Sequence, residues 1–542
     1  MVHIQATVPV LSGVAVDQGR FPWLTVVTFA PLAGAVIATL FPSRALGLHR
    51  LWALVVTLFT FGLSLAMLTA YHAGSGFQLV DRAIWVKSLN FNYMLGVDGI
   101  SLFMVLLTTF LMPAAVLVSW RIEQQAKYYM VAFLILESAM IGSFVALDLL
   151  LFFLFFEALL FPMYLIIGGW GSERRVYAAV KFFLFTMAGS AFLLVSILFL
   201  YFRAGSDLGH TTFDYTQLQH LVLPVNTARW LFLGFFVAFA VKVPLFPLHT
   251  WLPDAHTEAP TAGSLILAAV LLKIGAYGLI RFNLGLFPEA SQHFRAFVMV
   301  LAVIGIVYGA AVALIQTDVK RLVAYSSVSH LGFVVLGTFA FTLQGMSGGV
   351  LQMVNHGLST GALFLLVGML YDRTHTRDLG RMGGLGATMP ALAGVFLFVA
   401  LSSVGLPGLN GFVGEFLVLL GTFVVSKPFA VAAVVAVVLA AIYLLWAYQR
   451  MMHGQVVNEE HRLLPDLSRR EYAILVPIMA AILFVGVFPQ PLLDRIEPAA
   501  RQAVTCVIAT NQSPRAGRGV KLASFCSEQA RLVPSSDLAR RP

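Results

Sequence analysis

Apolar stretches of about 20 residues recur along almost the whole chain, and each is long enough for a helix to cross the ~30 Å hydrocarbon core of a bilayer. A membrane β-barrel would instead show ~10-residue segments of alternating polarity. The pattern therefore predicts an all-α polytopic membrane protein. Its fourteen predicted spans are at roughly 23–41, 51–71, 97–120, 128–146, 149–169, 180–203, 229–252, 262–284, 295–316, 320–342, 346–371, 390–423, 428–450 and 472–492.

Composition agrees with this pattern. Of the 542 residues, 59% are hydrophobic and 11% are charged, whereas soluble domains average roughly 45–50% apolar and about 25% charged residues. No interval between the spans is long enough for a soluble domain. The N-terminus has no basic region before its first apolar stretch, so we expect no cleaved signal peptide and a retained first span.

The basic residues indicate how the chain crosses the membrane. Odd-numbered loops carry sixteen Lys and Arg residues, whereas the N-terminus and the even-numbered loops carry eight. By the positive-inside rule the odd-numbered loops face the cytoplasm and both termini lie outside. Eight further basic residues beyond residue 494 count against this orientation if the tail stays close to the membrane. We attribute the net charge of +9 to topology and tail, and we expect no nucleic-acid partner.

Motifs for common cofactors are absent from the sequence. It has two cysteines, Cys506 and Cys526, and neither belongs to a CxxC pair. It also lacks a P-loop and a strand–GxGxxG–helix unit. We therefore expect no cofactor in this chain, neither metal nor iron–sulfur cluster nor nucleotide, so any redox chemistry belongs to a partner. If the tail is external, the two cysteines could pair.

Five charged residues interrupt the predicted spans, and these are Lys242, Lys273, Glu137, Glu157 and Glu415. A charge at the bilayer centre costs at least ~2.5 kcal/mol and must face protein or water. Burial favours the neutral forms of carboxyl and amino groups in general, so such groups can exchange protons. Glu157 and Lys242 are the obvious pair of opposite sign. The pattern predicts a proton relay; a snorkelling lysine or a static ion pair that only fixes packing remain alternatives.

Histidines extend this series. His330 lies in the tenth span and His356 in the eleventh, while His249 and His256 follow an interruption in the seventh. Imidazole titrates near pH 6.5 and therefore suits a proton relay. The alternative for each residue is a core histidine satisfied by a hydroxyl or a carbonyl group.

Two spans carry helix-breaking residues beside a buried charge. The segment KVPLFP follows Lys242 with Pro244 and Pro247, and GLPGLNG precedes Glu415. Irregular backbone at this depth is tolerated only against protein or a hydrated cavity. The interrupted spans, the seventh and the twelfth, are five apart, and this spacing predicts two inverted five-helix repeats. The predicted divisions are 1–127, 128–284, 295–450, a last helix at 472–492, and a polar, disordered tail at 500–542.

Several stretches together resemble a known family. They are FFEALLFPMYLIIGGWG, KVPLFPLHTWLPDAHTEAPTAGSLILAAVLLKIGAYGLIRF, DVKRLVAYSSVSHLGF, NHGLSTGALFLLVGMLYDRTHTRDL and GLPGLNGFVGEF. The sequence of these stretches is similar to that of the subunit M family of bacterial NADH–quinone oxidoreductase, or respiratory complex I. This family belongs to the antiporter-like subunits. The resemblance implies fourteen helices with two inverted repeats. It implies proton-transfer roles for Glu157, Lys242, Lys273 and Glu415, with His330 and His356 linking two half-channels.

These observations lead to one functional hypothesis. The chain is expected to be a multi-pass, proton-translocating subunit in the inner (plasma) membrane, coupled to quinone reduction elsewhere in a complex. Glu157 would be the gate acid, Lys242 would tune it, Lys273 would carry protons, and Glu415 would face the exit. Its expected partners are other membrane subunits of complex I, especially sister antiporter-like subunits, together with the lipid bilayer and protons. The alternatives are a subunit of a cation–proton antiporter or membrane-bound hydrogenase, and a structural scaffold.

Overall fold

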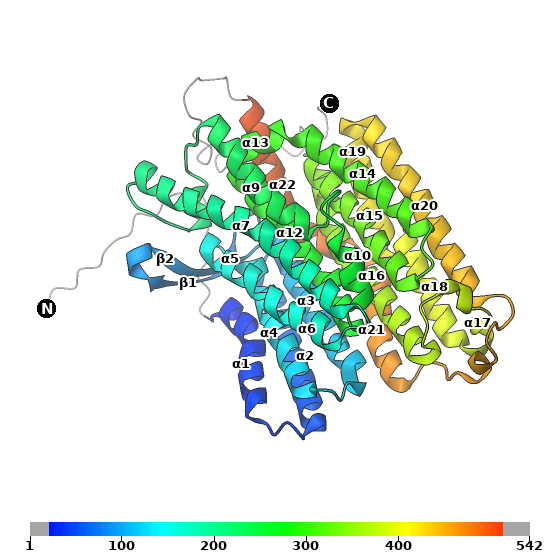
Figure 1. Ribbon diagram of the computed structural model, residues 1–542. Helices are drawn as coiled ribbons and strands as arrows, with labels where there is room; N and C mark the ends of the chain where they lie inside the picture. Colours follow the sequence, from blue (N-terminus) through cyan, green and yellow to red (C-terminus); the bar gives the residue numbers. More distant parts are fainter. Residues whose placement is uncertain (1–20, 513–542) are drawn as a thin grey trace.

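The computed structural model describes residues 21–512, and in this part of the chain nearly all residues belong to one bundle of helices (Figure 1). Thirteen helices in the described part are long and apolar enough to cross a membrane. The all-α prediction is confirmed, with one addition. A hairpin of β1 (Gln78–Val86) and β2 (Phe91–Val97), joined by the turn η1 (Lys87–Leu89), projects from one end of the bundle, at the left in Figure 1.

The hairpin connects the first helices to the core. Before it come α1 (Trp23–Leu40) and α2 (Leu46–Ala70), and after it come α3 (Gly99–Val118) and the turn η2 (Ser119–Arg121). Asp98 caps α3, because its carboxylate accepts hydrogen bonds from Ile100 N and Ser101 N while the Ser101 hydroxyl accepts one from Asp98 N. The hairpin was not predicted, since hydropathy alone does not detect so short a sheet.

The next segment contains the fourth to eighth spans. Its elements are α4 (Ala126–Val145), α5 (Leu149–Ala158), α6 (Leu160–Trp170), α7 (Arg175–Asp207), α8 (Tyr215–Leu218), α9 (Val225–Lys242), α10 (Trp251–Glu258), α11 (Thr261–Ile266), η3 (Leu267–Leu271), α12 (Leu272–Gly278), η4 (Leu279–Leu284) and α13 (Pro288–His293). Here η3 and η4 are π-helical, so α11 to η4 form one span that turns from α-helical to π-helical twice.

The last segment contains the remaining spans. Its elements are α14 (Arg295–Leu314), α15 (Val319–Phe339), α16 (Leu343–Thr374), η5 (Leu379–Arg381), α17 (Leu385–Thr388), α18 (Pro390–Val404), α19 (Asn410–Val425), α20 (Lys427–Met452), η6 (Glu459–Leu463), α21 (Arg469–Val487) and α22 (Gln490–Gln512).

Both predicted helix breaks are present. Helix α9 ends at Lys242 and α10 begins at Trp251, with Pro244 and Pro247 in the irregular stretch between them. Helix α18 ends at Val404, and α19 begins at Asn410. Between them Gly405 and Gly408 have φ values of +85° and +90°, which residues with a Cβ rarely adopt. The seventh and twelfth spans therefore each consist of two half-helices.

The centre of the bundle is formed by the span α11–η4 together with α15 and α16. In their most apolar windows, 100%, 94% and 100% of the residues are buried, compared with 33% for α2 and α20 at the periphery. These three central spans carry Lys273, His330 and His356. These three candidate proton-transfer residues therefore lie where the neighbouring helices cover them on all sides.

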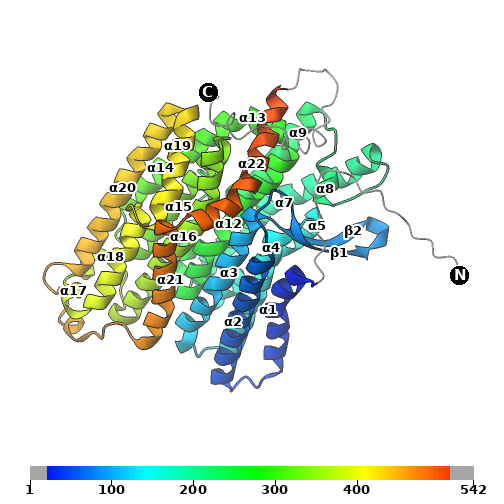
Figure 2. The ribbon, with the colours of Figure 1, turned by 180° about the vertical axis from the view of Figure 1, so that it is seen from behind.

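Helix α22 corrects one prediction. Residues 500–512, which we assigned to the polar tail, continue a helix that starts at Gln490 and lies obliquely across the bundle (Figure 2). Ile496, Ala500, Val504 and Val507 recur every three or four residues and are buried, so the helix packs through an apolar stripe despite its polar composition. Cys506 lies in this helix. Residues 513–542, with Cys526, lie outside the described residues, as does the N-terminus up to residue 20.

Alternate loops meet at the same end of the bundle. Loops 41–45, 121–125, 171–174, 315–318 and 375–384 lie at one end, which we call the basic end. Hydrogen bonds tie these loops together: the Lys127 ammonium donates to Phe41 O at 2.9 Å, and the Trp170 indole donates to Gln124 O at 2.7 Å. The hairpin and loop 208–214 lie at the other end, where the Asn90 amide donates to Thr211 O at 2.9 Å.

Candidate functional site

Lys273 occupies the middle of the eighth span, between the two π-helical segments η3 and η4. Its side chain is fully buried. The ammonium donates to the main-chain oxygen of Ala268 at 2.5 Å and lies 2.6 Å from Nδ1 of His356 on α16. Short π-helical segments inside α-helices occur frequently at functional sites. Lys273 therefore reaches the neighbouring span directly.

His356 leads to His330 on α15 and then to Glu415 on α19. The two imidazole rings lie 5.9 Å apart between centroids, at an angle of 61°. Nδ1 of His330 lies 2.7 Å from Oε1 of Glu415. Lys273, His356, His330 and Glu415 thus form a row of titratable groups across three central spans and a half-helix.

A small polar cavity of about 10 Å³ lies beside the two histidines. It is lined by His330, Gln352, Asn355, His356, Ser359, Thr360, Ser402, Ser403 and Gly411. A volume of ~10–15 Å³, measured for the centre of a water-sized sphere, is about what one water molecule requires. The cavity therefore offers room for a water molecule that could connect the imidazoles.

Glu415 is held in place by its neighbours. Besides His330, the amide of Gln352 donates to the same carboxylate oxygen at 2.9 Å. Gly414 permits this approach, because a Cβ there would lie 2.5 Å from Oε1 of Gln352 and 2.8 Å from Nδ2 of Asn355. Such distances are far below van der Waals contact, so α19 can approach α16 only through a glycine.

The break in the twelfth span is bound to α16 by two asparagines. Nδ2 of Asn355 donates to Asn410 O at 2.7 Å, and Nδ2 of Asn410 donates to Asn355 O at 3.2 Å. The hydroxyls of Ser359 and Ser402 lie 2.6 Å apart and contact Oδ1 of Asn410. These bonds join the start of α19 to α16 and pair buried side-chain amide and hydroxyl groups.

Lys242 and Glu157 form a second, separate group. The Lys242 ammonium lies 4.9 Å from the centre of the Phe156 ring and 5.6 Å from that of Phe182. It interacts with Glu157 through space, but no ion pair within 4 Å joins them in the described residues. Gly275 lies against Lys242, since a Cβ at residue 275 would lie 2.8 Å from the lysine Cβ. The eighth span therefore passes directly beside the lysine.

Three further candidates make no direct contact with the row of Lys273, His356, His330 and Glu415 in the described residues. Glu137 on α4 is fully buried, and neither carboxylate oxygen has a hydrogen-bond partner in the described residues. His249 stacks with Phe246, while His256 on α10 stacks on Phe364 at 4.6 Å. Both ring nitrogens of His256 are buried without a hydrogen-bond partner in the same part of the chain.

Two buried cations were missed because we counted them among the loop residues. Arg281 lies in η4, and its guanidinium pairs with Asp98 at 2.5 Å, where both side chains are less than a tenth exposed. Lys320, in the first turn of α15, is 7% exposed. The capping pattern of Asp98 predicts its place before α3, but nothing local in the sequence indicates its partner 183 residues away.

The arrangement suits movement of protons, because ammonium, imidazole and carboxyl groups lie in sequence within hydrogen-bond reach or one water apart. In residues 21–512, no group of three His, Cys, Asp or Glu side chains is arranged to hold a metal ion.

Comparison with known proteins identifies the family of the chain. The family model described as "NADH:quinone oxidoreductase/Mrp antiporter, TM" matches residues 146–440, more than half of the chain. The NADH-quinone oxidoreductase subunit M of Rhodobacter capsulatus is 47% identical over 89% of this chain and 96% of its own. The NADH-ubiquinone oxidoreductase chain 4 of Arabidopsis thaliana is 43% identical over 86% of this chain and 93% of its own.

Solved structures show the same fold. A chain of respiratory complex I from Thermus thermophilus has a TM-score of 0.81 and 33% identity, covering 89% of this chain and 99% of that one. A chain of the Mrp complex from Dietzia is similar in fold alone, with a TM-score of 0.78 and 20% identity over 89% of this chain and 98% of that chain. The chain therefore belongs to the NADH:quinone oxidoreductase/Mrp antiporter family, with subunit M and chain 4 of NADH–quinone oxidoreductases among its relatives.

Proposed function

We propose that this chain is a proton-translocating membrane subunit of an NADH–quinone oxidoreductase. The observation that carries the proposal is the row from Lys273 through His356 and His330 to Glu415, with contacts of 2.6 Å and 2.7 Å at its ends. In this function Lys273 carries protons and passes them through the imidazoles, and Glu415 faces the exit. The chain itself supplies no redox centre, and quinone reduction in partner subunits drives the transfer.

Glu157 and Lys242 have a different role in this proposal. Glu157 is the gate acid, and Lys242 alters the proton affinity of Glu157 through the electric field between them. The lack of an ion pair within 4 Å between them in the described residues supports this role, because the two groups interact electrostatically without a bond that would fix them together. A modulating charge acts by being near or far, whereas a proton carrier needs a direct contact. Glu137 is a further proton-transfer candidate for which we assign no step.

The architecture and assembly follow the same proposal. Residues 128–284 and 295–450 are two inverted repeats, each with one broken span. The basic end faces the cytoplasm of an inner (plasma) membrane, and both termini lie outside. The partners are other membrane subunits of the complex, in particular sister antiporter-like subunits.

The decisive experiment measures proton uptake by inverted membrane vesicles, normalised to quinone reduction by the assembled complex. Replacing Glu415 by Gln should remove most proton uptake per quinone reduced, because an amide cannot accept the proton that His330 passes on. The matched control is Glu173→Gln, a change at an exposed position of loop 171–174. Normal coupling in the Glu415 variant at normal protein levels would reject the proposed row.

A further inference from the structure

Two short pairings of main chain have the same form at opposite ends of the bundle. In the first bracket, Leu149 N donates to Phe213 O at 2.8 Å and Tyr215 N donates to Leu147 O at 2.9 Å. In the second bracket, Val319 N donates to Arg377 O at 3.0 Å and Leu379 N donates to Thr317 O at 2.9 Å. Each is an isolated antiparallel bridge between two aspartates, Asp148 with Asp214 and Asp318 with Asp378.

The four aspartates also accept matching hydrogen bonds from main-chain N–H groups that follow them. Asp148 and Asp318 cap α5 and α15, each accepting hydrogen bonds from the main-chain N–H groups two and three residues ahead. Asp214 and Asp378 accept from the N–H two residues ahead, at 2.9 Å and 2.8 Å. The two brackets therefore have the same main-chain pairing and the same pattern of aspartate hydrogen bonds. A difference between their side chains can be compared position by position.

The side chains at two matching positions differ. Leu150 of the first bracket corresponds to Lys320 of the second, because each lies two residues after its capping aspartate. Phe213 likewise corresponds to Arg377, because each lies one residue before the second aspartate. The first bracket forms with two apolar residues. The two cations of the second bracket are therefore not needed for the bracket itself.

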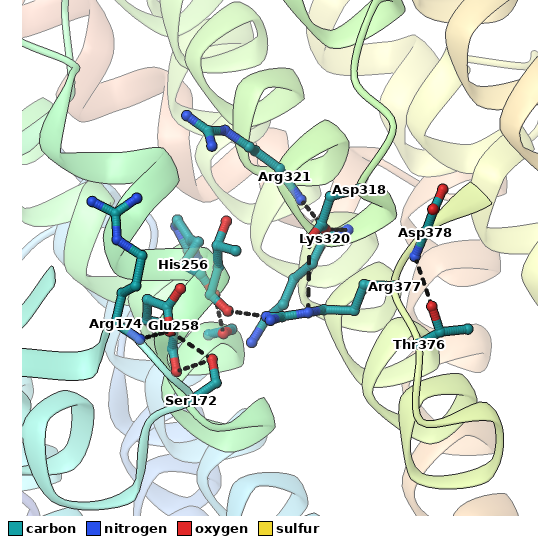
Figure 3. A network of polar contacts seen from close by, with 12 residues as sticks. Ser172, Arg174, His256, Glu258, Asp318, Lys320, Arg321, Thr376, Arg377 and Asp378 are labelled. Atoms are coloured by element: carbon teal, nitrogen blue, oxygen red, sulfur yellow. Dashed lines mark hydrogen bonds and ion pairs between the residues drawn. The ribbon is translucent and has the colours of Figure 1, made fainter. Parts of the chain in front are cut away.

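Both cations contact the C-terminal end of α10, and Arg377 also forms an ion pair with Asp318 of the bracket at 3.6 Å (Figure 3). The Lys320 ammonium donates to Ala259 O at 2.5 Å, and the Arg377 guanidinium donates to Thr257 O. The last carbonyl groups of a helix have no partner within it and carry partial negative charge, so they suit cations. Lys320 is buried, and no carboxylate lies within 4 Å of its ammonium in the described residues. The other side of this helix end is held by Ser172, whose N–H donates to Glu258 O at 2.9 Å.

This helix end determines where His256 lies. His256 precedes Thr257 directly, and its ring is stacked parallel on Phe364 of α16, at an angle of 7°. It interacts electrostatically with Lys320 and Lys273, and with His356. With no hydrogen bond to either ring nitrogen in the described residues, only stacking and the position of α10 fix the imidazole.

We infer that Lys320 and Arg377 are positioning residues: the two cations clasp the end of α10 to α15 and to loop 375–378, and thereby hold His256 at the basic end of the proton row. The function of the clasp in pumping rests on the proposed function, but its existence does not. The clasp joins the half-helix of the seventh span to residues of the second predicted repeat.

The test uses the assembled complex, with Cys506 and Cys526 of this chain replaced by Ser and a single reporter, Ala255→Cys, placed in α10. Ala255 is fully buried, so a maleimide reaches the thiol only when α10 moves. In Lys320→Leu, which copies Leu150, alkylation of the reporter should accelerate about tenfold, since a charge-assisted hydrogen bond is lost. Arg377→Gln should act in the same direction. Lys320→Arg should restore protection, because it keeps the cation.

Arg381→Gln is the matched control, since Arg381 is an exposed cation near Arg377 in the same stretch of chain. Equal alkylation rates in the parent, in Lys320→Leu and in Arg377→Gln would overturn the clasp. Faster alkylation with an unchanged number of protons taken up per quinone reduced would overturn the role of the clasp in positioning His256. Faster alkylation with fewer protons per quinone, reversed by Lys320→Arg, is the expected result. Glu415→Gln tests the proposed function separately, because its outcome does not depend on the reporter.

Discussion

The ammonium of Lys273 and Nδ1 of His356 lie 2.6 Å apart, although these residues are 83 positions apart in the chain and belong to different spans. An ammonium can donate to Nδ1 only when that nitrogen is unprotonated. In the proposed row the charged lysine is the donor and the neutral imidazole the acceptor, so that the proton moves from Lys273 to His356. The fully buried lysine has no carboxylate within 4 Å in the described residues to keep it charged.

This relationship distinguishes two lysines experimentally. We predict that Lys273→Arg loses most proton pumping, because arginine stays protonated in proteins and cannot hand its proton to His356. Lys242→Arg should retain substantial pumping, because its proposed role needs only a positive charge near Glu157. Both variants are compared as proton uptake per quinone reduced in inverted vesicles. If Lys273→Arg pumps like the parent, Lys273 is a fixed charge and the row does not run through it.

Glu157 provides the next prediction. Glu157→Gln should remove most pumping while the complex still assembles, because the amide keeps the size of the side chain but cannot bind the proton. Glu157→Asp should be milder, since it keeps a titratable group. Assembly is checked by the amount of complex recovered in mild detergent. Near-normal proton transport by Glu157→Gln at parental protein levels is incompatible with a gate acid.

Two glycines test the packing around Glu415. In Gly414→Ala the new methyl group would collide with Gln352 and Asn355, and overpacking of this kind costs about 1–3 kcal/mol. Gly394 in α18 is the control, because a Cβ there meets nothing within 4 Å. Gly394→Ala should stabilise by about 0.5–1 kcal/mol, as expected inside a helix. Thermal unfolding of the purified complex measures both changes, and equal midpoints for the two variants would contradict the close approach of α19 and α16.

Asp148, outside the spans, gives a pH-dependent prediction. Burial raises the pKa of its carboxyl to about 7 from an ordinary value of 3.8. Folding therefore favours the protonated form, and the associated stability is present at low pH and is lost as the pH rises through about 7. The parent should lose more stability than Asp148→Asn between pH 6 and pH 8. The asparagine oxygen keeps the cap of α5, so the variant should still assemble; parallel pH curves for the two proteins would show that Asp148 does not titrate in this range.

Orientation is tested with a pair of single cysteines. Glu173→Cys lies at the basic end and Lys87→Cys in the turn of the hairpin at the other end, and both positions are exposed. If the basic end faces the cytoplasm, an impermeant thiol reagent added to intact cells should label residue 87 and spare residue 173. Labelling of residue 173 alone would reverse the proposed topology.

Much of the site was predictable because burial of a charge is visible in a membrane sequence. Lys242, Lys273 and Glu415 stand among apolar residues, and the nearby Pro and Gly residues predicted both breaks. Lys320 was not predictable in this way. It lies two residues inside α15 and looks like a loop cation, and only its contact with Ala259 explains its burial.

Other features depend on contacts between distant segments. The pairing of Arg281 with Asp98 joins η4 to the start of α3, and Gln352 reaches Glu415 from another span. A hydropathy pattern describes each span separately and contains no record of such pairs. The π-helical segments beside Lys273 escaped prediction for a related reason, because a π turn and an α turn present similar apolar faces over a few residues.

The burial of the central spans has a consequence for biosynthesis. Helix α15 is capped by Asp318, has Lys320 and Arg321 in its first turn, and carries three serines and a histidine between residues 326 and 330. A translocon that tests each segment against lipid penalises every such group, by about 2.5–3.5 kcal/mol for a charge at the helix centre. We therefore expect α15 to insert efficiently only beside spans already made, which then shield its polar groups from lipid. The polar groups of α15 would thereby make the order of synthesis part of how this protein enters the membrane.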